Sequence, residues 1–213
     1  MSAAAGERMP GAWQVTGTSS DAGWMPIPTG LDTDGAEAWV AANTAAMRTE
    51  WGEDWSPDAE QLIPAIIEAA PARRREEDSL AFLLWAGHRP LGVFVHVAIG
   101  TRSPGDALPG PGDGVLFESS GLGPGVLVPR TEQIGDAFVV GYDTVFAFAE
   151  DVVLIVSVEP TFQDLLGLVS PSVQLFMDSL ELTGPDGTAR RANTPALLEA
   201  QAVNTWVDSL ARP

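Results

Sequence analysis

The two histidines of the sequence, His88 and His96, are the first candidates for acid–base or metal chemistry, because the chain has no cysteine. His88 lies beside Arg89 in a Gly- and Pro-containing turn, which predicts a surface position. His96 shares a strand face with Phe94, which predicts a hydrogen-bonded or half-exposed side chain. A metal site or a His-based triad requires these imidazoles to converge with carboxylates, and the two belong to opposite arms of one hairpin. The sequence therefore predicts no catalytic residue, no metal ligand and no cofactor.

Three short motifs resemble known sites only in part. Residues 121–125 (GLGPG) are glycine-rich like a phosphate-binding loop, but an apolar run follows them in place of Lys-Ser/Thr and a helix. Asp32 and Asp34 resemble the start of a calcium loop, yet no Glu closes that loop. Residues 119–120 (SS) lack the flanking glycines of a hydrolase nucleophile turn. We interpret the first motif as a tight turn and the two aspartates as helix caps.

The composition excludes some classes of partner. The net charge of the chain is −18 over 213 residues, which repels phosphate backbones and anionic lipid, so we expect no nucleic-acid and no membrane partner. The same charge favours a basic protein partner, although acidity also serves solubility. No stretch reaches the ~20 apolar residues of a membrane span, and the first residues lack a signal-peptide pattern. These features predict a soluble, cytoplasmic protein.

The stretch that organises the chain is 137–160, in which two apolar runs meet at the acidic pair 150–151. Alternating β-branched and aromatic residues predict a β-hairpin there. The return run 152–158 is almost wholly apolar, so we expect a central strand that is covered on both faces. Further strands are predicted at 80–86, 91–99, 115–118 and 126–130. Together these segments predict an α+β fold with an antiparallel sheet of about six strands packed by helices.

Helices are predicted at 36–51, from 57 to the arginines 73–75, at 161–168, at 171–180, and from 194 onward. Asp32 or Asp34 caps the first and Ser56 the second. In the fourth, Leu175, Phe176 and Leu180 are expected to face inward. We divide the chain into a flexible arm (1–23), a core domain (24–184), and a linker with a C-terminal amphipathic helix (185–213).

The two tails carry the candidate partner-binding residues. Aromatic side chains in tails either close the edge of a core or anchor a partner, and both alternatives stay open for Trp13 and Trp206. The predicted last helix has one apolar stripe, which must be buried on its own sheet, on a second copy or in a partner. The candidate partner-binding residues are Trp13, Leu198, Ala202, Trp206 and Leu210.

Three pieces of the sequence carry a resemblance to a known fold: the turn 121–125, the paired runs 142–149 and 152–160, and the ending 179–182 (SLEL). In their order they resemble the Mog1/PsbP-like sandwich, and in particular small actinobacterial proteins of unassigned role. The resemblance covers residues 24–182 and leaves both tails outside. Members of this fold include adaptors, photosystem accessory subunits and chaperones for secreted effectors, so the resemblance implies a fold more than an activity.

Three hypotheses for function follow. The first is a non-enzymatic protein-interaction module, an adaptor or chaperone-like accessory factor, which binds another protein or a second copy of itself. The second is an acidic immunity protein that neutralises a basic toxin. The third is a hydrolase or small-ligand binder that uses a pocket between sheet and helices, lined by Asp143, His96 or Tyr142.

Overall fold

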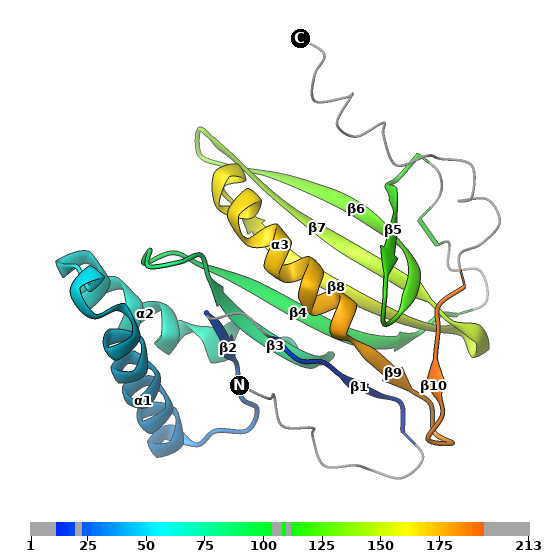
Figure 1. Cartoon of the computed structure of the whole chain (residues 1–213), viewed down its shortest axis with the longest axis horizontal. Coiled ribbons are helices and arrows are strands. Elements are labelled where there is room, and N and C mark those ends of the chain that lie inside the picture. Colours follow the sequence, from blue (N-terminus) through cyan, green and yellow to red (C-terminus); the bar gives the residue numbers. More distant parts are fainter. Residues whose placement is uncertain (1–11, 20–22, 104–107, 110–111, 194–213) are drawn as a thin grey trace.

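The computed structural model of the chain describes residues 12–19, 23–103, 108–109 and 112–193 (Figure 1). A seven-stranded sheet has the order β2-β3-β4-β8-β7-β6-β5, and a three-stranded sheet has the order β1-β9-β10. Every strand pair is antiparallel, which confirms the predicted α+β class. The strands are β1 (Gln14–Thr16), β2 (Trp24–Pro26), β3 (Asp78–Trp85), β4 (Gly92–Thr101), β5 (Val115–Ser119), β6 (Gly123–Ile134), β7 (Ala137–Ala147), β8 (Val152–Thr161), β9 (Glu181–Thr183) and β10 (Ala189–Arg190).

The described helices are α1 (Thr33–Trp51), α2 (Pro57–Arg73) and α3 (Gln163–Ser179), with two short 3-10 turns, η1 (Gly52–Asp54) and η2 (Ala149–Asp151). The caps of the first two helices are those expected from the sequence. Asp32 accepts the N–H of Gly35 at 2.8 Å, and Ser56 accepts the N–H of Ala59 at 3.1 Å. Each cap satisfies a backbone donor that the first helical turn leaves without a partner.

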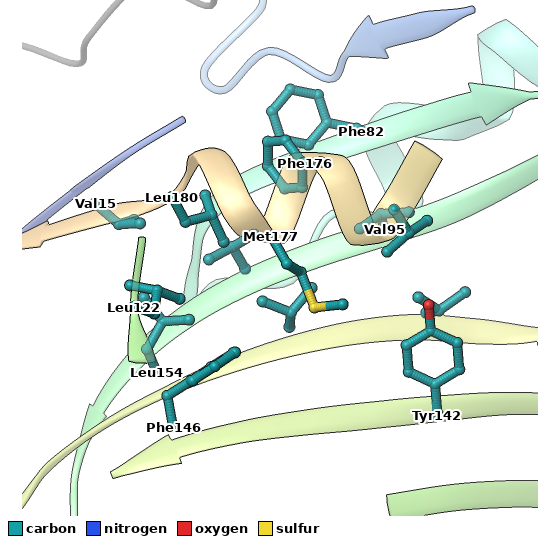
Figure 2. Close-up of a cluster of buried hydrophobic side chains, with 14 of the residues drawn as sticks. Val15, Phe82, Val95, Leu122, Tyr142, Phe146, Leu154, Phe176, Met177 and Leu180 are labelled. Atoms are coloured by element: carbon teal, nitrogen blue, oxygen red, sulfur yellow. The ribbon is translucent and has the colours of Figure 1, made fainter. Parts of the chain in front are cut away.

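Helix α3 lies across one face of the large sheet and closes the main core (Figure 1). Its buried side chains recur at intervals of three and four residues and so form one stripe. They are Leu165, Val169, Val173, Phe176 and Met177. Figure 2 shows side chains of α3 and of the strands meeting in this core, with Tyr142 and Phe146 contributed by β7.

Helices α1 and α2 cover the opposite face of the sheet, but only at its β2–β3 end. They form a second core cluster with the strand residues Met25, Ile27, Ala81, Leu83 and Trp85. From β4, only Phe94 packs against this cluster. The rest of this face lies outside the second cluster.

The central position of β8 is confirmed, but the prediction that both of its faces are covered is wrong. On the α3 side, the buried apolar members of the strand are Val152, Leu154, Val156 and Val158. On the other side Val153 and Ile155 stay half-exposed and belong to neither core cluster. The reason is the placement of α1 and α2, which do not extend over β8 and β7.

Two predictions about α3 are also wrong. The structure has one continuous helix where the sequence predicts two, and Pro171 lies inside it. Proline costs a backbone hydrogen bond, but the apolar stripe continues on both sides of Pro171, so packing maintains the helix. Leu175 is 54% exposed and does not face inward, because the 3.6-residue repeat turns it away from the stripe.

Parts of the predicted arm and of the predicted linker belong to the fold. Strand β1 pairs with β9, and β9 with β10, so that Val15 and Leu182 are buried neighbours. Ala192 is buried in the main core, and its N–H donates to the Leu122 carbonyl. Strands of two or three residues are too short to show a periodic pattern in sequence. The predicted C-terminal helix, with Leu198, Ala202, Trp206 and Leu210, lies outside the described residues.

Candidate functional site

The uncovered part of the sheet carries an apolar surface, which we call the open face. The register places Ala98 of β4 beside Ile155 of β8, and Ile155 beside Val145 of β7. In the next row Val153 of β8 lies beside Ala147 of β7. The open face consists of six half-exposed residues that belong to neither core cluster: Ala98, Leu116, Val145, Ala147, Val153 and Ile155.

The size of the open face fits a binding surface. Neighbouring strands lie about 4.8 Å apart, and same-face residues lie about 6.8 Å apart along a strand. Two to three rows across the strands from β4 to β5 therefore span roughly 300 Å². Within this span Val126 of β6, which lies beside Val145, is buried. Apolar patches of this size on a monomer are often functional.

A row of polar side chains borders the open face on the side of α2. His96, Ser157 and Asp143 lie next to one another on β4, β8 and β7. Ser157 Oγ donates to Asp143 Oδ1 at 2.6 Å, and Arg130 Nη2 lies 3.2 Å from the same oxygen. The Asp143 carboxylate is therefore already paired within the protein, and this row marks where the apolar surface ends.

His96 is the centre of a buried charged cluster. Its side chain is 1% exposed, and Nδ1 lies 2.7 Å from Asp78 Oδ2 while Nε2 lies 3.0 Å from Glu159 Oε1. Asp78 Oδ2 also accepts the N–H of Arg75 at 2.8 Å, and Arg73 forms an ion pair with Glu159. The cluster links the end of α2 to β3, β4 and β8. The expectation of a hydrogen-bonded His96 is confirmed.

This cluster has the residue types of an acid–base site, but its geometry favours a structural role. General acid–base catalysis needs a nitrogen or oxygen that reaches the reacting group. Both ring nitrogens of His96 face carboxylates, and the side chain of Asp78 is 0% exposed. Burial alone raises the pKa of Glu159, but the hydrogen bonds and charges of His96 and Arg73 outweigh it and hold that pKa below 4.5.

The pocket suggested by Asp143, His96 and Tyr142 does not assemble from those three residues. Tyr142 lies in the main core on the α3 face, whereas Asp143 and His96 share the row on the opposite face. Burial raises the pKa of Tyr142 to about 12, against the opposing effect of a hydrogen bond with Ser170. The phenol is a core group and does not line a common site with the other two.

His88 forms a pair that sequence reasoning missed. Its Nδ1 lies 2.6 Å from Asp54 Oδ2, and its ring stacks on Trp51 with 5.4 Å between centroids. A solvent-open cavity of about 580 Å³ between the β3–β4 turn and α3 is lined by His88 and Asp54, together with Arg89 and Ser172. The two residues are 34 positions apart, so no local spacing could have indicated the pair.

The tryptophans of the described chain mostly close the core. Trp24 and Trp51 are buried. Trp55 packs against the second cluster, and Trp13 packs against the main core with the Arg190 guanidinium 5.9 Å from its ring centroid. A partner-binding role for Trp13 stays a prediction.

The described part of the chain was also compared with the requirements of a metal site and of a membrane-spanning helix, and it meets neither. Within residues 12–19, 23–103, 108–109 and 112–193, no three His, Asp or Glu side chains are placed to hold a metal ion. None of the helices found there combines the length and the apolar character needed to cross a membrane. No family model, no curated protein and no solved structure shows significant similarity to this chain.

Proposed function

We propose that this protein is a non-enzymatic protein-interaction module, an adaptor or chaperone-like accessory factor, and that it binds its partner on the open face. The observation that carries the proposal is the row of half-exposed apolar residues in the middle of the sheet, such as Ile155 and Val145, which no described element covers. Burying roughly 300 Å² of such surface is worth about 7 kcal/mol before the cost of association.

The architecture supports the same proposal. An antiparallel sheet with one long helix across a face is consistent with a Mog1/PsbP-like sandwich, and adaptors and chaperones occur among proteins of that fold. We include the relation to that fold and a cytoplasmic location in the proposal. Fold likeness alone would not identify a function, so the open face remains its main support.

The charge of the chain indicates what kind of protein would bind. With a net charge of −18, the molecule attracts a basic partner over long range, and a toxin that requires neutralisation is one such partner. Association with a basic partner should weaken steeply as salt rises, because salt screens exposed charges. Affinity that does not change with salt would count against a basic partner while leaving apolar binding on the open face intact.

The test compares two charge insertions at exposed apolar positions. Ile155→Glu places a carboxylate in the centre of the open face, and Leu175→Glu places one on the outer side of α3. Each variant is checked for an unchanged circular dichroism spectrum. A partner identified by affinity capture is then purified and titrated by calorimetry against all three proteins.

We expect Ile155→Glu to weaken binding by at least about 30-fold, since truncating or charging a central contact costs about 2 kcal/mol or more. Leu175→Glu should bind like the wild type. Equal affinity of all three proteins would refute the open face as the binding surface.

A second candidate function rests on the pair formed by His88 and Asp54. An imidazole oriented by a carboxylate in an open cavity suits a small-ligand binder or a hydrolase, and Ser172 lines the same cavity. The test is hydrolysis of p-nitrophenyl acetate by the wild type and by His88→Asn. A rate that falls to the background in the variant would favour a hydrolase, and equal rates would exclude hydrolysis at this pair.

A further inference from the structure

We propose that the groove between α1 and α2 binds an amphipathic helix of a partner protein, with apolar side chains on one face of that helix and Lys or Arg side chains along its edges. None of the residues that line the groove belongs to the open face, so this is a second binding surface beyond the one in the proposed function. Three features of the groove support it: its shape, its apolar lining and the charges along its walls.

The groove lies between two helices that diverge from their connection. Near η1 the helices are held together by an ion pair of Arg48 with Glu60, and Figure 1 shows them separating toward their other ends. The cavity between them has a volume of about 790 Å³ and is open to solvent. Its lining runs along α1 from Thr33 to Arg48, about 22 Å, and along α2 from Pro64 to Pro71. A groove of this length accommodates about four turns of a docked helix.

The lining of the groove is mainly apolar, and most of its side chains are small. None of these apolar residues is buried, and Leu31, which precedes α1, is 38% exposed. Small side chains on α1 allow a second helix to approach closely, because the side chains at the contact set the distance between helix axes. The apolar lining residues are Leu31, Ala36, Val40, Ala41, Ala45, Pro64 and Pro71.

One polar side chain in the lining lacks a partner. Thr44 lines the groove, and its Oγ1 is buried without a hydrogen-bond partner among the described residues. On the same helix, Thr49 Oγ1 donates to the carbonyl of Ala45, four residues back, at 2.9 Å. Buried hydroxyls usually have a partner, because leaving one unpaired costs free energy. A polar group of the docked helix can supply the partner that Thr44 lacks.

The charges along the walls indicate the chemistry of the partner. Exposed carboxylates stand on both sides, Asp32 and Glu37 at α1 and Glu68 on α2. Among the described lining residues the only basic side chain is Arg48, which is already paired with Glu60. These walls therefore favour a helix with Lys or Arg at its edges. A second copy of this chain, with its net charge of −18, would be repelled there.

The test uses a fluorescein-labelled peptide of about 18 residues, with Leu recurring every three and four positions and Lys elsewhere, which forms a basic amphipathic helix. Its binding to the full-length protein is measured by fluorescence anisotropy at about 150 mM salt, which screens long-range attraction. Ala41→Arg places a bulky positive charge about halfway along the groove. Ala42→Arg adds the same charge to the same helix outside the lining and serves as the control. Both alanines are exposed, and circular dichroism verifies that each variant is folded.

We expect the peptide to bind the wild type and Ala42→Arg alike, and to bind Ala41→Arg at least about tenfold more weakly, because the new side chain blocks central contacts. The same peptide with Glu in place of Lys should not bind. Equal affinity of the two arginine variants would overturn the inference. So would binding of the Glu peptide, or failure of the Lys peptide to bind the wild type.

A second pair of variants tests the charges and keeps the inference falsifiable if Ala41→Arg does not fold. Glu37→Gln/Glu68→Gln removes two carboxylates from the walls of the groove. Glu76→Gln/Glu77→Gln makes the same change in net charge at exposed positions outside it. We expect the first variant to weaken peptide binding about fivefold, as for two lost exposed ion pairs, and the control to bind like the wild type. Equal losses in both variants would mean unspecific attraction and would overturn the inference.

Photo-cross-linking locates the bound peptide and separates this surface from the open face. The Lys peptide carries a benzophenone in place of one leucine, and the cross-linked residues are identified by mass spectrometry. We expect them in α1 and α2. Cross-links to β7 or β8 would overturn the inference without touching the proposed function. A wild-type dimer that Ala41→Arg dissociates in sedimentation would also overturn it, because a second copy would then occupy the groove.

Discussion

Replacement of His96 by phenylalanine tests whether the buried charged cluster holds α2 against the sheet. The variant leaves the Asp78 carboxylate fully buried, with the N–H of Arg75 as its remaining hydrogen-bond donor. Removing one partner of a buried ion pair typically costs about 3–5 kcal/mol. For a chain of this size each kcal/mol lowers Tm by about 2–4 °C, so we expect a drop of roughly 6–20 °C.

The double variant His96→Phe/Asp78→Leu removes both polar side chains and separates this reasoning from a simple packing defect. Because replacing both members of a buried pair by apolar groups is often neutral, the double variant should recover most of the loss. Urea unfolding followed by circular dichroism at neutral pH gives all the free energies of unfolding. The control is His88→Phe, whose exposed pair with Asp54 should be worth at most about 1 kcal/mol.

Two outcomes would refute the account of the cluster. In the first, His96→Phe costs no more than His88→Phe, which would mean that the buried contacts contribute little. In the second, the double variant is no more stable than His96→Phe, which would mean that the lost packing of the imidazole, and not the unpaired carboxylate of Asp78, sets the cost.

Three further predictions concern single positions. The folded-state pKa of Glu159 lies below 4.5, so the contribution of this carboxylate to stability is complete above pH 4.5 and is lost as the pH falls through the folded-state pKa. The difference in unfolding free energy between the wild type and Glu159→Gln should therefore shrink on acidification. A difference that stays constant with pH would contradict this prediction. Tyr142 is the only tyrosine of the chain, so the tyrosinate absorbance should rise near pH 12 in the folded protein and near pH 10 in urea. The free energy of unfolding should fall as the pH rises between these two values. Titration at the same pH in both states would contradict the burial of Tyr142. Gly121→Ala would place a Cβ 2.2 Å from the Leu180 carbonyl oxygen and should lower the free energy of unfolding by at least about 2 kcal/mol. Gly167→Ala, on the solvent-exposed side of α3, should raise it by about 0.5–1 kcal/mol. Thermal melts that rank the two variants the other way would contradict this prediction.

Local features of this protein follow from the sequence alone. The caps Asp32 and Ser56 involve neighbours three residues away, so their residue types suffice to place them. The hairpin of β7 and β8 shows in the alternation of its side chains and the acidic pair at its turn. The surface position of His88 is also determined at this level.

Coverage of the sheet was decided only by the tertiary structure. An apolar strand predicts burial, but the positions of helices distant in sequence decide which of its two faces is covered. Here α1 and α2 pack at the β2–β3 end of the sheet and leave Ile155 half-exposed. The contacts of both histidines with carboxylates join residues far apart, 63 positions for His96 and Glu159 and 34 for His88 and Asp54. Pairings of this range depend on the register of strands and the placement of helices, which no local pattern of residues encodes.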